Sequence, residues 1–89
     1  MGGLLFDPDA LSGIPQLEGE RILEKTDWLW DNRGVIIHHP LRHELSGYYK
    51  RQLGRYRIIY SYDDNLDEMV IHLVGTRDSI YKDAIKRFR

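Results

Sequence analysis

The chain lacks cysteine, has little proline and contains no long hydrophobic run. Its 89 residues include no cysteine and three prolines, which excludes disulfide bridges, thiolate catalysis and cysteine-based zinc sites. No apolar stretch approaches the ~18 residues that a membrane-spanning helix needs, and the first ten residues lack the basic start and apolar segment of a signal peptide. We therefore expect a single cytoplasmic domain over residues 1–89, with no membrane association.

Net charge is also small, at −1, yet the charges are unevenly placed. Residues 1–31 hold seven acids and two bases, residues 32–62 hold one acid and six bases, and residues 63–89 hold six acids and five bases. The middle third is therefore strongly basic within a chain that is nearly neutral. A local positive field of this kind is a weak indication of an anionic partner.

The first third of the chain has the pattern of helices after one short strand. The apolar run at 3–6 is bounded by Gly and by Asp-Pro, which is typical of a strand end. An aspartate just after it can cap a helix, and apolar residues at helical spacing from about position 20 predict a second helix. We expect two short antiparallel helices within 8–32, joined near Gly19.

The rest of the chain has the pattern of strands and a short final helix. Segments rich in β-branched and aromatic residues alternate with turn sequences of Gly, Pro, Asp and Asn. Helices followed by hairpin-linked strands indicate an α+β domain, with two helices packed on a small antiparallel sheet in the order β-α-α-β-β-β. The predicted strand segments are 35–37, 48–53, 55–62 and 68–75, and the final helix is 79–88.

Residues 48–62, YYKRQLGRYRIIYSY, interleave tyrosines with cationic side chains. Because side chains alternate between the two faces of a strand, Tyr56, Ile58 and Tyr60 share one face, which we expect to be core. The other face has two interpretations. Its cations lie in solvent on the exposed face of the sheet, as Lys and Arg often do, or they bind a phosphate. The cations expected on that face of 55–62 are Arg55 and Arg57. Within 48–53, Lys50 and Gln52 share one face, and Tyr49 and Arg51 share the other.

A further arginine favours the second interpretation. Arg77 follows the strand predicted to pair with 55–62, so it should approach Arg55 and Arg57 at the end of the hairpin. Like charges side by side destabilise a sheet unless something negative joins them. Tyr81 brings a hydroxyl to the same corner, and convergent cations beside a phenol suggest a phosphodiester site.

Three of the four histidines lie in the segment HHPLRH, residues 38–43. Adjacent residues on a strand point to opposite faces, so His38 and His39 are not expected to share a metal, and no carboxylate or cysteine completes a ligand set. We expect no metal site. These histidines are weaker candidates for acid–base catalysis, and we expect His72, in mid-strand, to be structural.

Two ordered motifs run through residues 38–82. The first is the frame L-x-G-x-(Y/W)-(K/R)-x-x-(V/L)-G-x-Y-R-I-x-Y, and the second is V-G-x-R followed after a short gap by I-Y. Together they resemble the RelE/ParE superfamily of toxins from bacterial type II toxin–antitoxin systems. The matching residues are Leu45, Gly47, Tyr49, Lys50, Leu53, Gly54, Tyr56, Arg57, Ile58 and Tyr60 in the first motif, and Val74, Gly75, Arg77, Ile80 and Tyr81 in the second.

The resemblance implies a RelE-like fold and, for the RelE branch, a metal-independent endoribonuclease that needs no cofactor. Such a toxin cuts mRNA on the ribosome and is neutralised by a cognate antitoxin. The RNA 2′-hydroxyl is the nucleophile, so the protein must orient it, move its proton and neutralise the phosphorane.

On this resemblance the catalytic residues are Lys50, Arg57, Arg77 and Tyr81. Arg57 is the phosphate ligand, Arg77 stabilises the leaving oxygen, Lys50 is the candidate base, and Tyr81 stacks on a base or assists proton transfer. The chain departs from the family at Gln52, where a basic residue is usual, and at Thr76, where lysine or histidine is common. Residues expected to contact RNA or the ribosome are Arg51, Gln52 and Arg55, and the two arginines are also candidates for antitoxin contact.

Two other functions stay open at this point, because fold alone does not decide chemistry. The ParE branch shares the fold and inhibits DNA gyrase without cutting RNA. A degenerate member would only bind its antitoxin and repress its own operon. Mapping mRNA ends after expression separates the nuclease from both.

Overall fold

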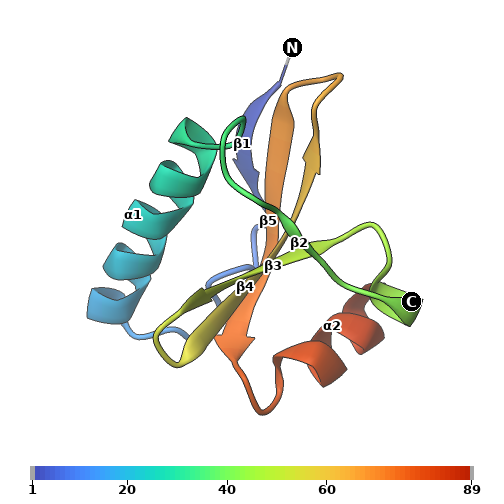
Figure 1. Ribbon diagram of the computed structural model, residues 1–89. Helices are drawn as coiled ribbons and strands as arrows, with labels where there is room; N and C mark the ends of the chain where they lie inside the picture. The colour runs from blue at the N-terminus through green and yellow to red at the C-terminus, as the bar shows by residue number, and fades with distance from the viewer. Residues whose placement is uncertain (1, 89) are drawn as a thin grey trace.

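A mixed five-stranded sheet runs through the middle of the molecule (Figure 1). The computed structural model describes residues 2–88. The strand order is β1-β5-β4-β3-β2; β1 pairs with β5 in parallel, and the other neighbours are antiparallel. The fold is α+β as expected, but the prediction of a purely antiparallel sheet is wrong. The strands are β1 Gly3–Phe6, β2 His39–Pro40, β3 Tyr49–Leu53, β4 Tyr56–Asp63 and β5 Glu68–Thr76.

One helix, α1 (Gln16–Asp31), replaces the two antiparallel helices predicted within 8–32. The residues before it form hydrogen-bonded turns, and Pro15 occupies the N-cap position, where its missing N–H costs nothing. Gly19 does not break the helix, since its N–H donates to the Pro15 carbonyl at 2.8 Å. A glycine inside a helix costs about 1 kcal/mol, and the helix formers around it outweigh that cost.

The predicted strand at 35–37 is also absent from the structure. The N–H groups of Val35 and Ile36 both donate to the Asn32 carbonyl, at 3.0 and 3.1 Å, in the turn that ends α1. Those donors are therefore not free for a sheet ladder, and the strand that does form is the two-residue β2. The other predicted strands and the final helix, α2 (Ile80–Phe88), are confirmed to within a residue or two.

The two helices lie on opposite sides of the sheet (Figure 1). On the α1 side, Ile22 and Leu29 pack against Tyr56, Ile58 and Tyr60, as the strand alternation predicts. On the other side, a smaller cluster joins α2 to the sheet and to the short 3-10 helix η1 (His43–Leu45). The buried members of that cluster are Leu45, Ile59, Ile80 and Ala84.

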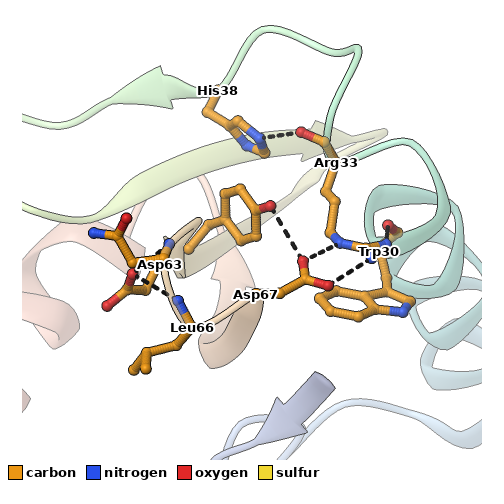
Figure 2. Close-up of polar contacts among 8 residues, drawn as sticks. Trp30, Arg33, His38, Asp63, Leu66 and Asp67 are labelled. Atoms are coloured by element: carbon orange, nitrogen blue, oxygen red, sulfur yellow. Dashed lines mark hydrogen bonds and ion pairs between the residues drawn. The ribbon is translucent and has the colours of Figure 1, made fainter. Parts of the chain in front are cut away.

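A polar cluster holds the segment that leads from α1 to β2 (Figure 2). The Arg33 guanidinium pairs with Asp67 at 2.6 Å and stacks 3.6 Å above the Trp30 ring. His38 bonds to the Arg33 carbonyl at 2.9 Å and to the Tyr60 hydroxyl at 2.7 Å. These bonds tie β2 to the sheet and to the end of α1.

Within residues 2–88, neither helix has the length and apolar character needed to cross a membrane.

Candidate functional site

An open hollow of about 640 Å³ lies on the α2 side of the sheet. Its lining comes from β2, β3, β4, the turn after β5, and the first turn of α2. This set contains every residue that the sequence predicts as catalytic. The lining residues are His39, Lys50, Arg51, Gln52, Arg57, Arg77 and Tyr81.

Strand register explains how the hollow collects its side chains. Gln52 lies opposite Arg57 across the β3–β4 pair, and Arg57 lies opposite Gly75 across the β4–β5 pair. Cross-strand partners project from the same face of a sheet. Lys50, two residues from Gln52, shares that face and has His39 of β2 as its own partner. The register therefore sets four polar side chains side by side.

Gly75 allows α2 to complete the hollow. A Cβ atom added at this position would lie 3.0 Å from Cδ1 of Ile80, which is tighter than ordinary packing. The bare backbone lets the start of α2 lie against β5, with Ile80 buried. Tyr81, the next residue, then borders the hollow, and Arg77 reaches it from the turn between β5 and α2.

The cations of the hollow have no acidic partner within residues 2–88. Lys50, Arg57 and Arg77 form no ion pair there, and no carboxylate borders the hollow. Arg57 is held by its own turn, since Nη1 donates to the carbonyls of Gly54 at 3.1 Å and of Tyr56 at 3.0 Å. Converging positive charges without a counter-ion are unfavourable until an anion binds. The arrangement suits a phosphate group.

Three arginines outside the hollow form ion pairs with carboxylates. Arg33 pairs with Asp67, and Arg87 pairs with Asp7. Arg55 was expected beside Arg57 and Arg77, but it turns toward α1 and pairs with Glu18 at 2.9 Å. It lies in the turn before β4, so strand alternation does not set its direction. Arg55 therefore lies outside the hollow, and its contact with RNA stays a prediction.

Arg51 borders the hollow, but its guanidinium points away from it. Its guanidinium lies on the α1 side, where Nη2 donates to the Ile37 carbonyl at 2.8 Å, and 5.9 Å separates its Cζ from the centre of the Trp28 ring. This is the side that alternation predicts for residue 51. An RNA contact by Arg51 would require breaking that bond.

The four histidines separate into distinct environments. His38 packs among Tyr49, Tyr60 and Tyr62 on the α1 side, whereas His39 borders the hollow, so the predicted opposite orientation is confirmed. His72 bonds through Nε2 to Ser61 Oγ at 2.8 Å, and burial lowers its pKa.

Sequence reasoning gave His39 little weight, although its register opposite Lys50 places it in the hollow. Its position in HHPLRH, directly before a proline, was the only signal. No group of three potential metal-ligating side chains occurs within residues 2–88.

Solved structures of RelE toxins and of RelBE complexes share this fold. A chain of the RelBE2 toxin–antitoxin complex from Mycobacterium tuberculosis aligns with a TM-score of 0.74 and 26% identity, covering 85% of this chain and 91% of that chain. The isolated Escherichia coli RelE toxin aligns with a TM-score of 0.65 and 25% identity over 100% of both chains. An arginine double mutant of E. coli RelE in the free state aligns with a TM-score of 0.69 and 25% identity over 94% of both chains.

Neither a protein-family model nor a curated protein gives a significant match to the sequence. The structural likeness therefore carries the comparison, and it confirms the resemblance that the two sequence motifs predicted.

Proposed function

This chain is a RelE-like protein, and we propose that it is the toxin of a toxin–antitoxin pair that cuts mRNA on the ribosome. One observation carries the proposal. Lys50, Arg57 and Arg77 converge without a carboxylate on one open hollow, beside the Tyr81 side chain. Three cations without carboxylate partners, in a RelE-like fold, are better suited to binding an RNA phosphodiester than to binding an uncharged protein surface.

The proposed reaction is transesterification by the RNA itself. The 2′-oxygen attacks the adjacent phosphorus, the bond from phosphorus to the 5′-oxygen breaks, and a 2′,3′-cyclic phosphate remains on the upstream fragment. The 2′-hydroxyl loses its proton, and the leaving 5′-oxygen gains one. Arg57 and Arg77 stabilise the charge on the phosphorane, because a guanidinium stays protonated and can bind two oxygens at once.

Lys50 and Tyr81 complete the proposed reaction centre. Lys50 lies on the same face of the sheet as Arg57 and takes part in proton transfer. Tyr81 offers both a ring on which a base can stack and a hydroxyl at the edge of the hollow. Gln52 lies beside Arg57 and can hydrogen-bond the RNA without adding charge.

A cognate antitoxin is the proposed protein partner. The M. tuberculosis structure that this chain resembles is a toxin–antitoxin complex. A small partner that covers the cationic hollow, or supplies carboxylates to it, would hold the toxin inactive by removing the phosphate site.

Expression of the protein with mapping of cellular mRNA ends tests the proposal. Wild type should arrest growth and produce new ends within coding sequences, while Arg57→Ala should do neither. Arg21→Ala is the matched control, since Arg21 is an exposed arginine on the opposite side of the sheet, and it should behave as wild type. Growth arrest without new mRNA ends would favour the gyrase-inhibitor alternative, and a harmless wild type would favour the degenerate one.

A chemically altered message tests the identity of the nucleophile. A single 2′-deoxy nucleotide at the mapped cleavage position should block cutting on the ribosome, because no 2′-oxygen remains to attack. The same change one nucleotide downstream is the control and should be tolerated. Cleavage of the 2′-deoxy message would exclude the proposed mechanism.

A further inference from the structure

We propose that His39 is the proton acceptor of the reaction, taking the proton of the 2′-hydroxyl while Lys50 supplies one to the leaving oxygen. The inference rests on the proposed function. His39 borders the hollow, is exposed, and is the cross-strand partner of Lys50. Its side chain therefore projects from the same face of the sheet as the cations.

The position of His39 is unusually well held for a residue on a two-residue edge strand. Pro40 restricts the residue before it to extended backbone. On one side, the Ile37 carbonyl accepts a bond from Arg51 at 2.8 Å, and on the other the Leu41 N–H donates to the Tyr48 carbonyl at 2.9 Å.

His38 adds a further restraint through its bond to the Arg33 carbonyl (Figure 2) and through its bond to the Tyr60 hydroxyl. These hydrogen bonds, on both sides of β2, hold the backbone of His39 in place. A catalytic side chain needs such support, because its geometry must be fixed before the reaction.

Cationic and phenolic side chains surround His39 at the hollow, and the neutral form of an imidazole is the one that accepts a proton. The groups facing His39 around the hollow are Lys50 on β3, Arg57 on β4, Arg77 after β5 and Tyr81 on α2. Histidine is a common general base in enzymes, and His39 is the one histidine in this lining.

The division of roles follows from the two kinds of side chain and their positions. The imidazole of His39 takes the 2′-proton as the bond from the 2′-oxygen to phosphorus forms, and it becomes an imidazolium. Lys50 is exposed and lies beside His39 on the sheet, so its ammonium can donate a proton to the 5′-oxygen as the bond from that oxygen to phosphorus breaks. Water then returns the proton to the lysine and removes it from the histidine.

Single-turnover cleavage of mRNA on programmed ribosomes, measured from pH 5.5 to 8.5, tests the assignment. For wild type the rate should rise from the acidic end of this range and then level off, because a general base must be deprotonated to act. His39→Gln should lower the plateau about 10²- to 10⁴-fold and abolish the acidic rise. Added imidazole should restore part of the rate of His39→Ala.

His43→Asn is the matched control. His43 is exposed, does not border the hollow, and has a φ of 57°, a backbone region that asparagine tolerates. This variant should keep the wild-type rate and pH profile. Thermal melting of each variant should match wild type, since His39 contributes no buried side chain.

Two outcomes would overturn the assignment while leaving the proposed function in place: His39→Gln cutting as fast as wild type, or cutting more slowly with the acidic rise unchanged. The second would mean that His39 binds RNA without accepting its proton. A wild type that cuts no message on ribosomes would overturn both proposals together.

Discussion

His38 makes two hydrogen bonds, one through each nitrogen of its ring. The Arg33 carbonyl can only accept, so Nε2 carries a hydrogen and donates it, and Nδ1 is hydrogen-bonded to the Tyr60 hydroxyl. Tyr60 is fully buried, and burial raises the pKa of its hydroxyl, which therefore keeps its hydrogen. The imidazole thus bridges the centre of the α1-side core and the end of α1.

Removing the Tyr60 hydroxyl should destabilise the fold through this bridge. Tyr60→Phe removes the hydrogen bond to Nδ1 of the half-buried His38, and the loss of one hydrogen bond costs about 0.5–1.5 kcal/mol in free energy of unfolding. Tyr49→Phe is the matched control on the same face, since Tyr49 packs against His38 and Tyr60 without a hydroxyl bond among residues 2–88. Urea unfolding at pH 7.5 measures both. Equal stability of the two variants would show that water replaces the lost donor.

Helix α2 carries Tyr81 to the hollow, and its far end is fastened by aromatic packing and an ion pair. The Phe88 ring stacks on Tyr48 with centroids 4.4 Å apart and meets the edge of His72 at 5.5 Å. Arg87 pairs with Asp7, just past β1. The environment of His72 therefore bears on how firmly α2 is attached.

Stability should fall as the solution is acidified from about pH 7 to pH 5. Burial lowers the pKa of His72, with Arg87 acting in the same direction and Asp7 against it. The unfolded chain, with a histidine pKa of about 6.5, then binds a proton more readily than the folded chain. Stability from the neutral side chain is present above the unfolded value and is lost as the pH falls toward the folded one.

Urea unfolding of wild type and His72→Gln at several pH values between 5 and 7.5 measures this effect. The variant should show a flatter dependence on pH, and His43→Asn, at an exposed position, should keep the wild-type slope. The pKa of Asp7 is also low, because the Asp9 amide donates to its carboxylate. Its contribution is lost only below about pH 4. An unchanged slope in His72→Gln would assign the acid sensitivity to other groups.

Over the whole molecule, positive and negative charges nearly cancel, but positive charge is concentrated at the hollow. Three cations line one hollow, yet the chain as a whole has a formal charge of −1. Non-specific attraction to free RNA depends on the phosphates that a protein can neutralise, and it weakens with salt. A nearly neutral protein should gain little from that attraction until the message is delivered in a fixed position.

We therefore expect cleavage to depend on ribosomes. The same message should be cut poorly or not at all when free, and efficiently when bound in the ribosome. Gln52→Lys, which adds a cation beside Arg57, should strengthen cleavage or leave it unchanged. Parallel assays with and without ribosomes, for both proteins, measure this. Efficient cutting of free RNA by wild type would contradict the expectation, and a large loss in the variant would give Gln52 a positive role of its own.

Local periodicity by itself determined which side chains share a face. Alternation along 55–62 predicts Tyr56, Ile58 and Tyr60 in the core with Arg57 opposite, and the structure confirms it. The same rule puts Lys50 and Gln52 on one face of 48–53 and Tyr49 and Arg51 on the other. These outcomes depend only on the pleat of a strand, which a short stretch of chain sets without help from distant residues.

Only the tertiary structure decided which segments became neighbours. The parallel pairing of β1 with β5, the turn that takes the N–H groups of Val35 and Ile36, and the pairing of Arg55 with Glu18 all depend on groups that no local pattern identifies. His39 shows this most clearly, because it reaches the hollow through its pairing with Lys50 of β3, which no local pattern predicts. Backbone hydrogen bonds and charges are satisfied by whichever partner the folded chain brings within reach, and that partner is a property of the whole fold.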